Sequence, residues 1–310
     1  MQPATPLPPG TAEQELHRHG LSAGTRSWAA TVLRRFVRNR MALLGAAILL
    51  VLVLLSVLAP VITQATLGWG RDEMDFQYIL APPSARHPLG TDSLGRDTLT
   101  RLLYGGRVSL GIALTTVVVY MVLGSVVGAV AGYFGGWVDN LVMRLVDVVQ
   151  SFPFLLLALT IVAIRGPGVE NLVVALVLLS WPTPARLVRG EFLSLREREF
   201  VEAARAVGAR AQQIIFRHML PNTLAPLIVN ATLDIAGVIL TEASLSYLGF
   251  GVQIPVPTWG NMLTEAQNLA VLTRMPWLWI PPGLMIFLTV MSINFVGDGL
   301  RDALDPRLKQ

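Results

Sequence analysis

The chain has 310 residues, of which 53% are hydrophobic and only 14% are charged. An ordinary soluble domain carries about 25% charged residues, so this chain has too few charges to cover a water-soluble surface. It holds no cysteine, which excludes disulfides, thiol catalysis and thiolate metal sites. Its four histidines are scattered without metal-ligand spacing, so we expect a membrane protein that binds no metal.

The first segment, residues 1–27, is rich in proline, glycine, serine and threonine and has no apolar periodicity. This composition predicts a disordered tail. A basic cluster of Arg34, Arg35, Arg38 and Arg40 follows, and the first long apolar block begins directly after it. A signal peptide would have an apolar region of only about 7–15 residues near the N-terminus, so a transmembrane helix is the favoured interpretation.

Six apolar blocks are each long enough to cross the bilayer as a helix, since about 17–25 residues span its hydrocarbon core. The blocks cover Ala42–Ile62, Val108–Ala131, Val146–Ile164, Leu172–Val188, Leu224–Thr241 and Trp277–Val296. Prolines inside or beside them, among them Pro153 and Pro226, predict kinks. The sequence therefore predicts an all-α integral membrane protein with six transmembrane helices.

The distribution of basic residues predicts how these helices are oriented. If both termini lie inside, 17 of the 24 arginines and lysines fall in inner segments. The positive-inside rule therefore favours an N-in/C-in topology, which explains the excess of basic residues without any nucleic acid. The predicted parts are a cytoplasmic tail with a basic flank (1–40), helix 1 (41–63), an extracytoplasmic segment (64–106), a five-helix core (107–300) and a cytoplasmic C-terminal tail (301–310).

A polar stretch between helices 4 and 5, residues 189–221, is too long for a plain connector. Phe200, Ala203, Ala204 and Val207 recur at helical spacing, which predicts a short helix with one apolar stripe. From this pattern alone, an amphipathic helix pair lying on the membrane surface is as good an interpretation as a docking element.

Gly208 follows this helix and suits a left-handed helix cap. Residues 211–220 then predict a second helix, with Ile214, Ile215 and Met219 on its apolar side. Pro221 fits the first turn of the fifth transmembrane helix, because a proline there loses no helical hydrogen bond.

The spacing of these residues resembles a signature of the membrane subunits of bacterial ABC importers. The matching positions are Glu202, Ala203, Ala204, Gly208, Leu220 and Pro221. His218 departs from the general signature, which has an apolar residue there, but the Arg-His-x-Leu-Pro-Asn order is similar to the dipeptide and oligopeptide branch. Residues 87–105, 242–249, 259–263 and 298–306 resemble the same branch, so the likeness covers about residues 30–309.

The resemblance implies that residues 189–221 are a cytoplasmic coupling-helix loop that docks on a separate ATPase. Its coupling residues would be Glu202, Ala203, Ala204, Arg205, Gly208, His218, Leu220 and Pro221. The implied partners are a homologous permease subunit, two cytosolic ATPase subunits that use ATP and Mg, and an extracytoplasmic solute-binding protein. That binding protein would meet residues 63–106 and 250–276. The implied location is the lipid of the bacterial cytoplasmic membrane, and the chain itself would bind no cofactor.

Three carboxylates fall within or beside the apolar blocks: Asp147, Asp234 and Glu242. A charged carboxylate at the bilayer centre costs about 2.5–3.5 kcal/mol on insertion scales, so each of them needs a partner or a wet pathway. Arg144 lies one helical turn before Asp147 and is its predicted partner. Asp234 has no local base, and we expect it to face the bundle interior, a partner subunit or a transport pathway.

Two further patterns predict structure more than chemistry. Asp92, Arg96 and Asp97 lie in a glycine-rich outer segment and predict turns with local salt bridges, in preference to a cation or catalytic site. Gly124 and Gly128 begin a repeat of small residues at four-residue spacing, which predicts close helix packing.

The remaining question is the energy source. An ATP-binding loop of the G-x-x-x-x-G-K-[ST] type needs a lysine, and the one lysine here is Lys309. The chain is therefore predicted to be a non-catalytic permease driven by partner subunits. A self-sufficient secondary transporter is the alternative, although no repeat is apparent. Di- or oligopeptides are the expected substrates, with nickel chelates, glutathione and other small solutes left open.

Overall fold

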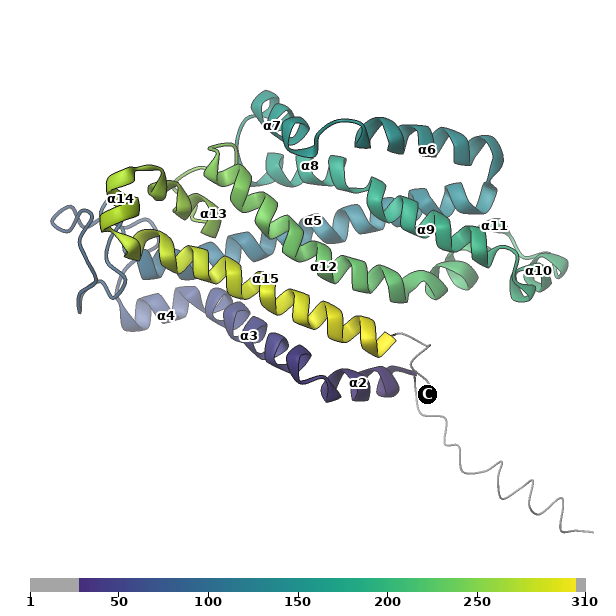
Figure 1. The fold of residues 1–310 in the computed structure, drawn as a ribbon, viewed down its shortest axis with the longest axis horizontal. Coiled ribbons are helices and arrows are strands. Elements are labelled where there is room, and N and C mark those ends of the chain that lie inside the picture. The colour runs from purple at the N-terminus through teal and green to yellow at the C-terminus, as the bar shows by residue number, and fades with distance from the viewer. Residues whose placement is uncertain (1–27, 305–310) are drawn as a thin grey trace, which may run out of the picture.

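The computed structural model describes residues 28–304, so the predicted disordered tail at 1–27 and the last six residues lie outside the described part. The described chain is built almost entirely from helices (Figure 1). In chain order these are α2 (Trp28–Arg38), α3 (Arg40–Val57), α4 (Ala59–Thr66), α5 (Thr98–Phe134), α6 (Gly136–Gln150), α7 (Phe154–Arg165), α8 (Val169–Ser180), α9 (Pro182–Leu195), α10 (Glu199–Ala206), α11 (Ala211–Gln213), the π-helix η1 (Ile214–Met219), α12 (Leu220–Tyr247), α13 (Trp259–Met262), the 3-10 helix η2 (Leu263–Gln267), α14 (Leu269–Arg274) and α15 (Pro276–Leu304).

Within residues 28–304, five helical stretches are long and apolar enough to cross a membrane. They are Arg40–Val57, Thr98–Phe134, Val169–Leu195, Ala211–Tyr247 and Pro276–Leu304. A sixth candidate is the pair α6 and α7, which is bent by 85°. The predicted all-α membrane fold is confirmed, and the predicted third span is the one that is sharply bent.

The second span begins earlier than its hydropathy predicts. The predicted start was Val108, because Arg101 and Arg107 interrupt the apolar pattern, but α5 begins at Thr98. Its first turn is stabilised by Asp97, whose carboxylate accepts a hydrogen bond of 2.7 Å from the backbone of Thr100. Arg101 can lie inside the helix since Asp92 compensates its charge at 3.3 Å.

The third span is broken where Pro153 predicts only a kink. Helix α6 ends at Gln150 and α7 starts at Phe154, and Pro153 between them cannot donate a backbone hydrogen bond. The expected pairing of Asp147 with Arg144 is wrong. Asp147 accepts a hydrogen bond of 2.8 Å from Arg186 on α9, because the packing of α6 against α9 brings that guanidinium closer.

A second ion pair joins the same two helices. Arg189 on α9 binds Asp139 on α6 through both carboxylate oxygens, with 2.6 Å between the Arg189 Nη2 and Asp139 Oδ2 atoms. Bidentate pairs of this type are directional and hold their partners in one geometry. The two pairs therefore fix α6 along α9, on the N-terminal side of the break at Pro153.

Small residues on α5 allow α9 to approach closely, as the glycine spacing predicts. A Cβ atom added at Gly124 would lie 2.5 Å from the Trp181 carbonyl oxygen, and one at Gly132 would lie 2.6 Å from Phe192. At Gly128 it would overlap the backbone of Ala185. Glycine is required at these positions because the two backbones are almost in contact.

The helices run roughly side by side, so the bundle has two ends (Figure 1). Helices α2 and α10 and the last turn of α15 lie at one end. Helices α4, α13 and α14 lie at the opposite end, together with the non-helical segment between α4 and α5. Helix α10, within residues 189–221, therefore shares one end of the bundle with the helices nearest the two termini.

Candidate functional site

The loop that precedes the fifth span contains the predicted short helix and its glycine cap. Helix α10 ends with Gly208 in the left-handed region at φ +77°. The Gly208 N–H donates to the Arg205 carbonyl at 2.9 Å, and the Ala209 N–H donates to the Ala204 carbonyl at 3.0 Å. These bonds close the end of the helix, so the predicted left-handed cap is confirmed.

The predicted apolar stripe of α10 does not form one buried face. Ala204 is buried, together with Val201, whereas Phe200 is 41% exposed and Val207 is 84% exposed. The helix packs on its neighbours with a face rotated by about one position from the predicted stripe, because Val201 belongs to the inner face. Phe200 and Val207 are therefore apolar side chains left open at one end of the bundle.

Glu202 and Ala203 are exposed beside this apolar surface, and so is Arg205. The Arg205 guanidinium lies over the Tyr133 ring, 5.6 Å from its centroid, which ties α10 to the end of α5. The signature residues of α10 thus divide in two: Ala204 anchors the helix, and Glu202 and Ala203 face outward.

The second predicted helix of the loop is not separate from the fifth span. Ile214, Ile215 and Met219 are buried as predicted, but they lie in a π-helical turn that runs directly into α12. Leu220 donates its N–H to the Ile215 carbonyl, the i→i+5 bond of a π-helix.

Pro221 lies in the first turn of α12, as predicted, and His218 and Leu220 are half-buried before it. The chain from Ala211 to Tyr247 is therefore one long helical rod. The short turn that contains Gly208 connects α10 to this rod.

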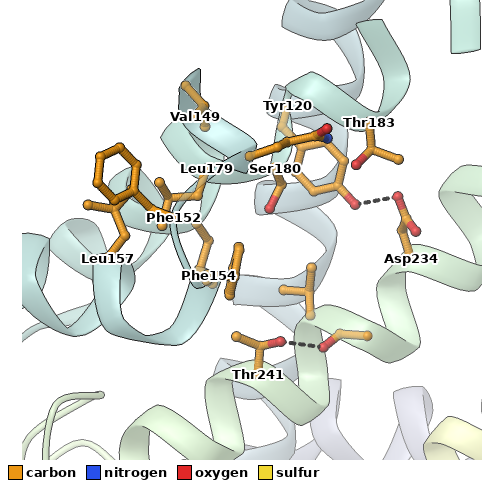
Figure 2. Close-up of a pocket in the computed structure, with 14 residues that line it drawn as sticks. Tyr120, Val149, Phe152, Phe154, Leu157, Leu179, Ser180, Thr183, Asp234 and Thr241 are labelled. Atoms are coloured by element: carbon orange, nitrogen blue, oxygen red, sulfur yellow. Dashed lines mark hydrogen bonds between the residues drawn. The ribbon is translucent and has the colours of Figure 1, made fainter. Parts of the chain in front are cut away.

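Asp234 lies near the middle of α12 and faces an open hollow with a volume of about 620 Å³ (Figure 2). The hydroxyl of Tyr120 on α5 donates a hydrogen bond of 2.7 Å to the Asp234 Oδ2 atom. The walls are formed by α5, α8, α9, α12, the end of α6 and the start of α7. Asp234 was expected to face the bundle interior, a partner subunit or a transport pathway, and in this chain it lines the hollow.

Glu242 has a different environment from Asp234. It is only 1% exposed and accepts hydrogen bonds from Ser246, at 2.7 Å, and from Ser109 on α5, at 3.2 Å. The Ser109 hydroxyl in turn accepts a hydrogen bond from the backbone of Trp259 at 3.1 Å. Glu242 therefore joins three segments of the fold, and it does not line the hollow at Asp234.

Asp147, the third predicted carboxylate, is half-exposed and pairs with Arg186 across α6 and α9. The structure thus does not bring the three carboxylates together. Asp147 and Glu242 stabilise helix contacts, and Asp234 is the one that lies in the hollow described above.

The outer residues Asp92, Arg96 and Asp97 form the predicted salt-bridge network. Arg96 binds Asp92 at 2.7 Å. Asp97 lies 3.0 Å from Nδ1 of His87, which is fully buried under the rings of Trp69 and Tyr78. These contacts fold the segment between α4 and α5, and they account for its charged residues.

Sequence reasoning missed Tyr120, Arg186 and Arg189. Tyr120 stands in an otherwise aliphatic run, and its polar hydroxyl is a signal that could have paired it with an intramembrane carboxylate. Arg186 and Arg189 were counted as topology signals, although their spacing places both on one face of α9, opposite Asp139 and Asp147 on α6.

Comparison with known families identifies this architecture. Residues 124–310 match the family described as binding-protein-dependent transport system inner membrane component. Residues 27–83 match the N-terminal transmembrane domain of oligopeptide transport permease C. The two matches together cover the first and the last part of the described chain.

Curated relatives match along nearly the whole chain. A putative peptide permease of Brucella suis is 43% identical over 88% of this chain and 89% of its own length. The dipeptide transport system permease DppC of Alkalihalophilus pseudofirmus is 42% identical over 89% of each chain. The glutathione transport system permease GsiD of Pectobacterium atrosepticum is 43% identical over 89% of this chain and 90% of its own.

Among solved structures, the inward-facing MetNI methionine ABC transporter has a chain of similar fold. The TM-score is 0.54 at 21% identity, over 66% of this chain and 96% of that chain. The predicted multi-pass placement in the bacterial inner membrane is confirmed by the family match. The chain belongs to the binding-protein-dependent transport system inner membrane component family and is a permease subunit of an ABC importer.

Proposed function

We propose that this permease forms one half of the translocation pathway of an importer for di- and oligopeptides. The relatives that match along most of the chain carry names that refer to peptides, dipeptides and glutathione, which is itself a tripeptide. The match to the N-terminal domain of oligopeptide transport permease C supports the same class.

The other half is a homologous permease subunit, and both halves receive substrate from an extracytoplasmic binding protein. The proposed contact surface for that protein comprises residues 63–106 and 250–276. These two segments touch each other through a hydrogen bond of 2.6 Å from Ser93 to Glu265. A surface shared by both segments is suited to a binding protein that must dock in one orientation.

ATP and Mg are used by two separate ATPase subunits, and this chain hydrolyses no ATP. Its single lysine is Lys309, so it has no lysine placed to reach the phosphates of a nucleotide in a P-loop. The energy must therefore enter through contact with another chain.

The observation that carries this proposal is the outward face of α10. Glu202, Phe200 and Val207 are exposed together at one end of the bundle, next to the Gly208 hinge. A charged residue beside exposed apolar side chains is the composition expected of a protein contact. We propose that α10 docks in a groove of the ATPase and transmits its closure to α12.

Replacing Glu202 by alanine should uncouple the complex. Truncation of a hot-spot residue at a protein interface costs about 2 kcal/mol or more, so if Glu202 is such a residue, ATP-driven uptake into proteoliposomes should fall at least about tenfold. ATP hydrolysis by the purified complex should continue, because the catalytic groups lie in the ATPase subunits.

Glu199→Ala is the matched control. Glu199 is also exposed and acidic and lies in the same first turn of α10, so both changes have the same effect on the helix dipole. Uptake by Glu199→Ala should stay within about twofold of the wild-type rate. Normal uptake by Glu202→Ala, or equal losses in both variants, would contradict a specific docking role.

A further inference from the structure

The hollow at Asp234 contains a single formal charge. Its lining residues come from six helices and include several polar side chains, but neither arginine, lysine nor histidine is among them. They are Tyr120, Val149, Gln150, Phe152, Phe154, Leu157, Leu176, Leu179, Ser180, Thr183, Asp234, Gly237, Val238 and Thr241. An uncompensated carboxylate in such a place attracts a cation and repels an anion.

The Asp234 carboxylate is held in place by one hydrogen bond and can accept further ones. Tyr120 donates to its Oδ2 atom, whereas its Oδ1 atom has no hydrogen bond within the described chain (Figure 2). If the Tyr120–Asp234 hydrogen bond served only to join α5 and α12, the second carboxylate oxygen would not need to face an open hollow. The geometry leaves one oxygen for a donor that enters the hollow.

Further acceptors lie nearby on α8 and α9. Ser180 and Thr183 line the hollow on either side of the break at Trp181. An alkylammonium group has three N–H donors, and the Asp234 carboxylate and the hydroxyls of Ser180 and Thr183 are acceptors among the lining residues.

The other walls of the hollow are apolar. Phe152, Phe154 and Leu157 lie across from Asp234, at the start of α7 and in the break before it (Figure 2). The volume of about 620 Å³ is within the range of roughly 300–1,000 Å³ for small-molecule sites. A ligand with one cationic end and an apolar body fits this combination.

We propose that Asp234, positioned by Tyr120, binds the protonated amino group of the transported peptide within the permease. This inference rests on the proposed importer function and adds a substrate-recognition site inside the membrane. Because Asp234 lies on the helical rod that begins at Ala211, movement of α10 also moves this site.

The test is equilibrium binding to the complete transporter complex in lipid nanodiscs, without binding protein, at neutral pH. The probes are alanyl-phenylalanine, which has a free amino group, and its N-acetylated derivative, which has none. Wild-type complex should bind the free dipeptide at least about tenfold more tightly, and Asp234→Asn should lose this preference. Asparagine can still accept the hydrogen bond from Tyr120, so the helix contact is retained.

Thr241→Val is the control for a general disturbance of the hollow. The Thr241 hydroxyl already donates to the Gly237 carbonyl at 2.8 Å, so its removal should change the affinity by less than about twofold. Equal binding of both probes by wild type, a preference retained in Asp234→Asn, or no binding at millimolar concentrations would each overturn the assignment.

ATP-driven uptake by the same purified complexes, reconstituted into proteoliposomes together with the binding protein, separates this inference from the proposed function. A wild-type complex that imports peptide but shows no preference for the free amine contradicts the amine site alone. A complex with no ATP-dependent import contradicts the importer proposal itself.

Discussion

Gly208→Pro is expected to abolish ATP-driven uptake while the permease still inserts and assembles. Gly208 has φ +77°, and proline fixes φ near −65°, so the turn between α10 and α11 cannot keep its geometry. Helix α10 would leave its place beside Tyr133 and lose its alignment with the rod that includes α12. The measurements are uptake into proteoliposomes and the yield of intact complex from membranes.

Gly208→Ala should have the same kind of effect as Gly208→Pro, but a smaller one. No atom lies within 4 Å of a Cβ added at Gly208, so alanine there suffers only from the left-handed backbone, about 1–2 kcal/mol. Uptake should be reduced but measurable. If Gly208→Pro transported peptide at the wild-type rate, the hinge would have no part in coupling.

Gly128→Ala is expected to destabilise the permease strongly for a change of one methyl group. The added Cβ would overlap the Ala185 backbone, and a backbone cannot move aside as a side chain can. Overpacking of this type costs about 1–3 kcal/mol, which corresponds to a fall of roughly 5 °C in the unfolding midpoint. Thermal unfolding in detergent measures it.

Gly111→Ala in the same helix is the matched control. No atom lies within 4 Å of a Cβ at Gly111, and alanine favours a helix over glycine by about 1 kcal/mol. This variant should be as stable as wild type or slightly more stable. A Gly128 variant with the same midpoint as the Gly111 variant would show that α5 and α9 do not pack as closely as described.

The features predicted correctly from sequence depend on local chemistry. Apolar runs predict membrane helices because the bilayer requires them, and Gly208 predicts a left-handed cap since few other residues adopt that conformation. The Gly124 and Gly128 spacing predicts close packing for a similar local reason. In each case the chemistry of the residue type is enough to predict the local structure.

The features that were missed depend on residues far apart in the chain. Asp147 pairs with Arg186 instead of Arg144, because the contact of α6 with α9 decides which guanidinium is near. Tyr120 and Asp234 meet across two helices, and neither residue alone predicts the hollow between them. The buried face of α10 was misplaced since its orientation is set by its neighbours and not by periodicity alone.

The second helix of the proposed coupling loop and the hollow lie on one continuous helical rod. It runs from Ala211 to Tyr247, and Asp234 is near the middle of its membrane-spanning part. Under the proposed coupling mechanism, a push at α10 would be transmitted along this rod and would change the position of Asp234 relative to Tyr120 on α5. The same movement would link ATP-driven closure at one end of the bundle to release of the proposed bound amine in the middle.

The central claim is that this permease is driven by a separate ATPase. The direct measurement is peptide uptake into proteoliposomes that contain both permease halves and the binding protein, with and without the ATPase subunits. The account predicts uptake only when the ATPase subunits and ATP are both present, whatever ion gradient is applied. Uptake driven by a proton or sodium gradient in the absence of the ATPase subunits would contradict it.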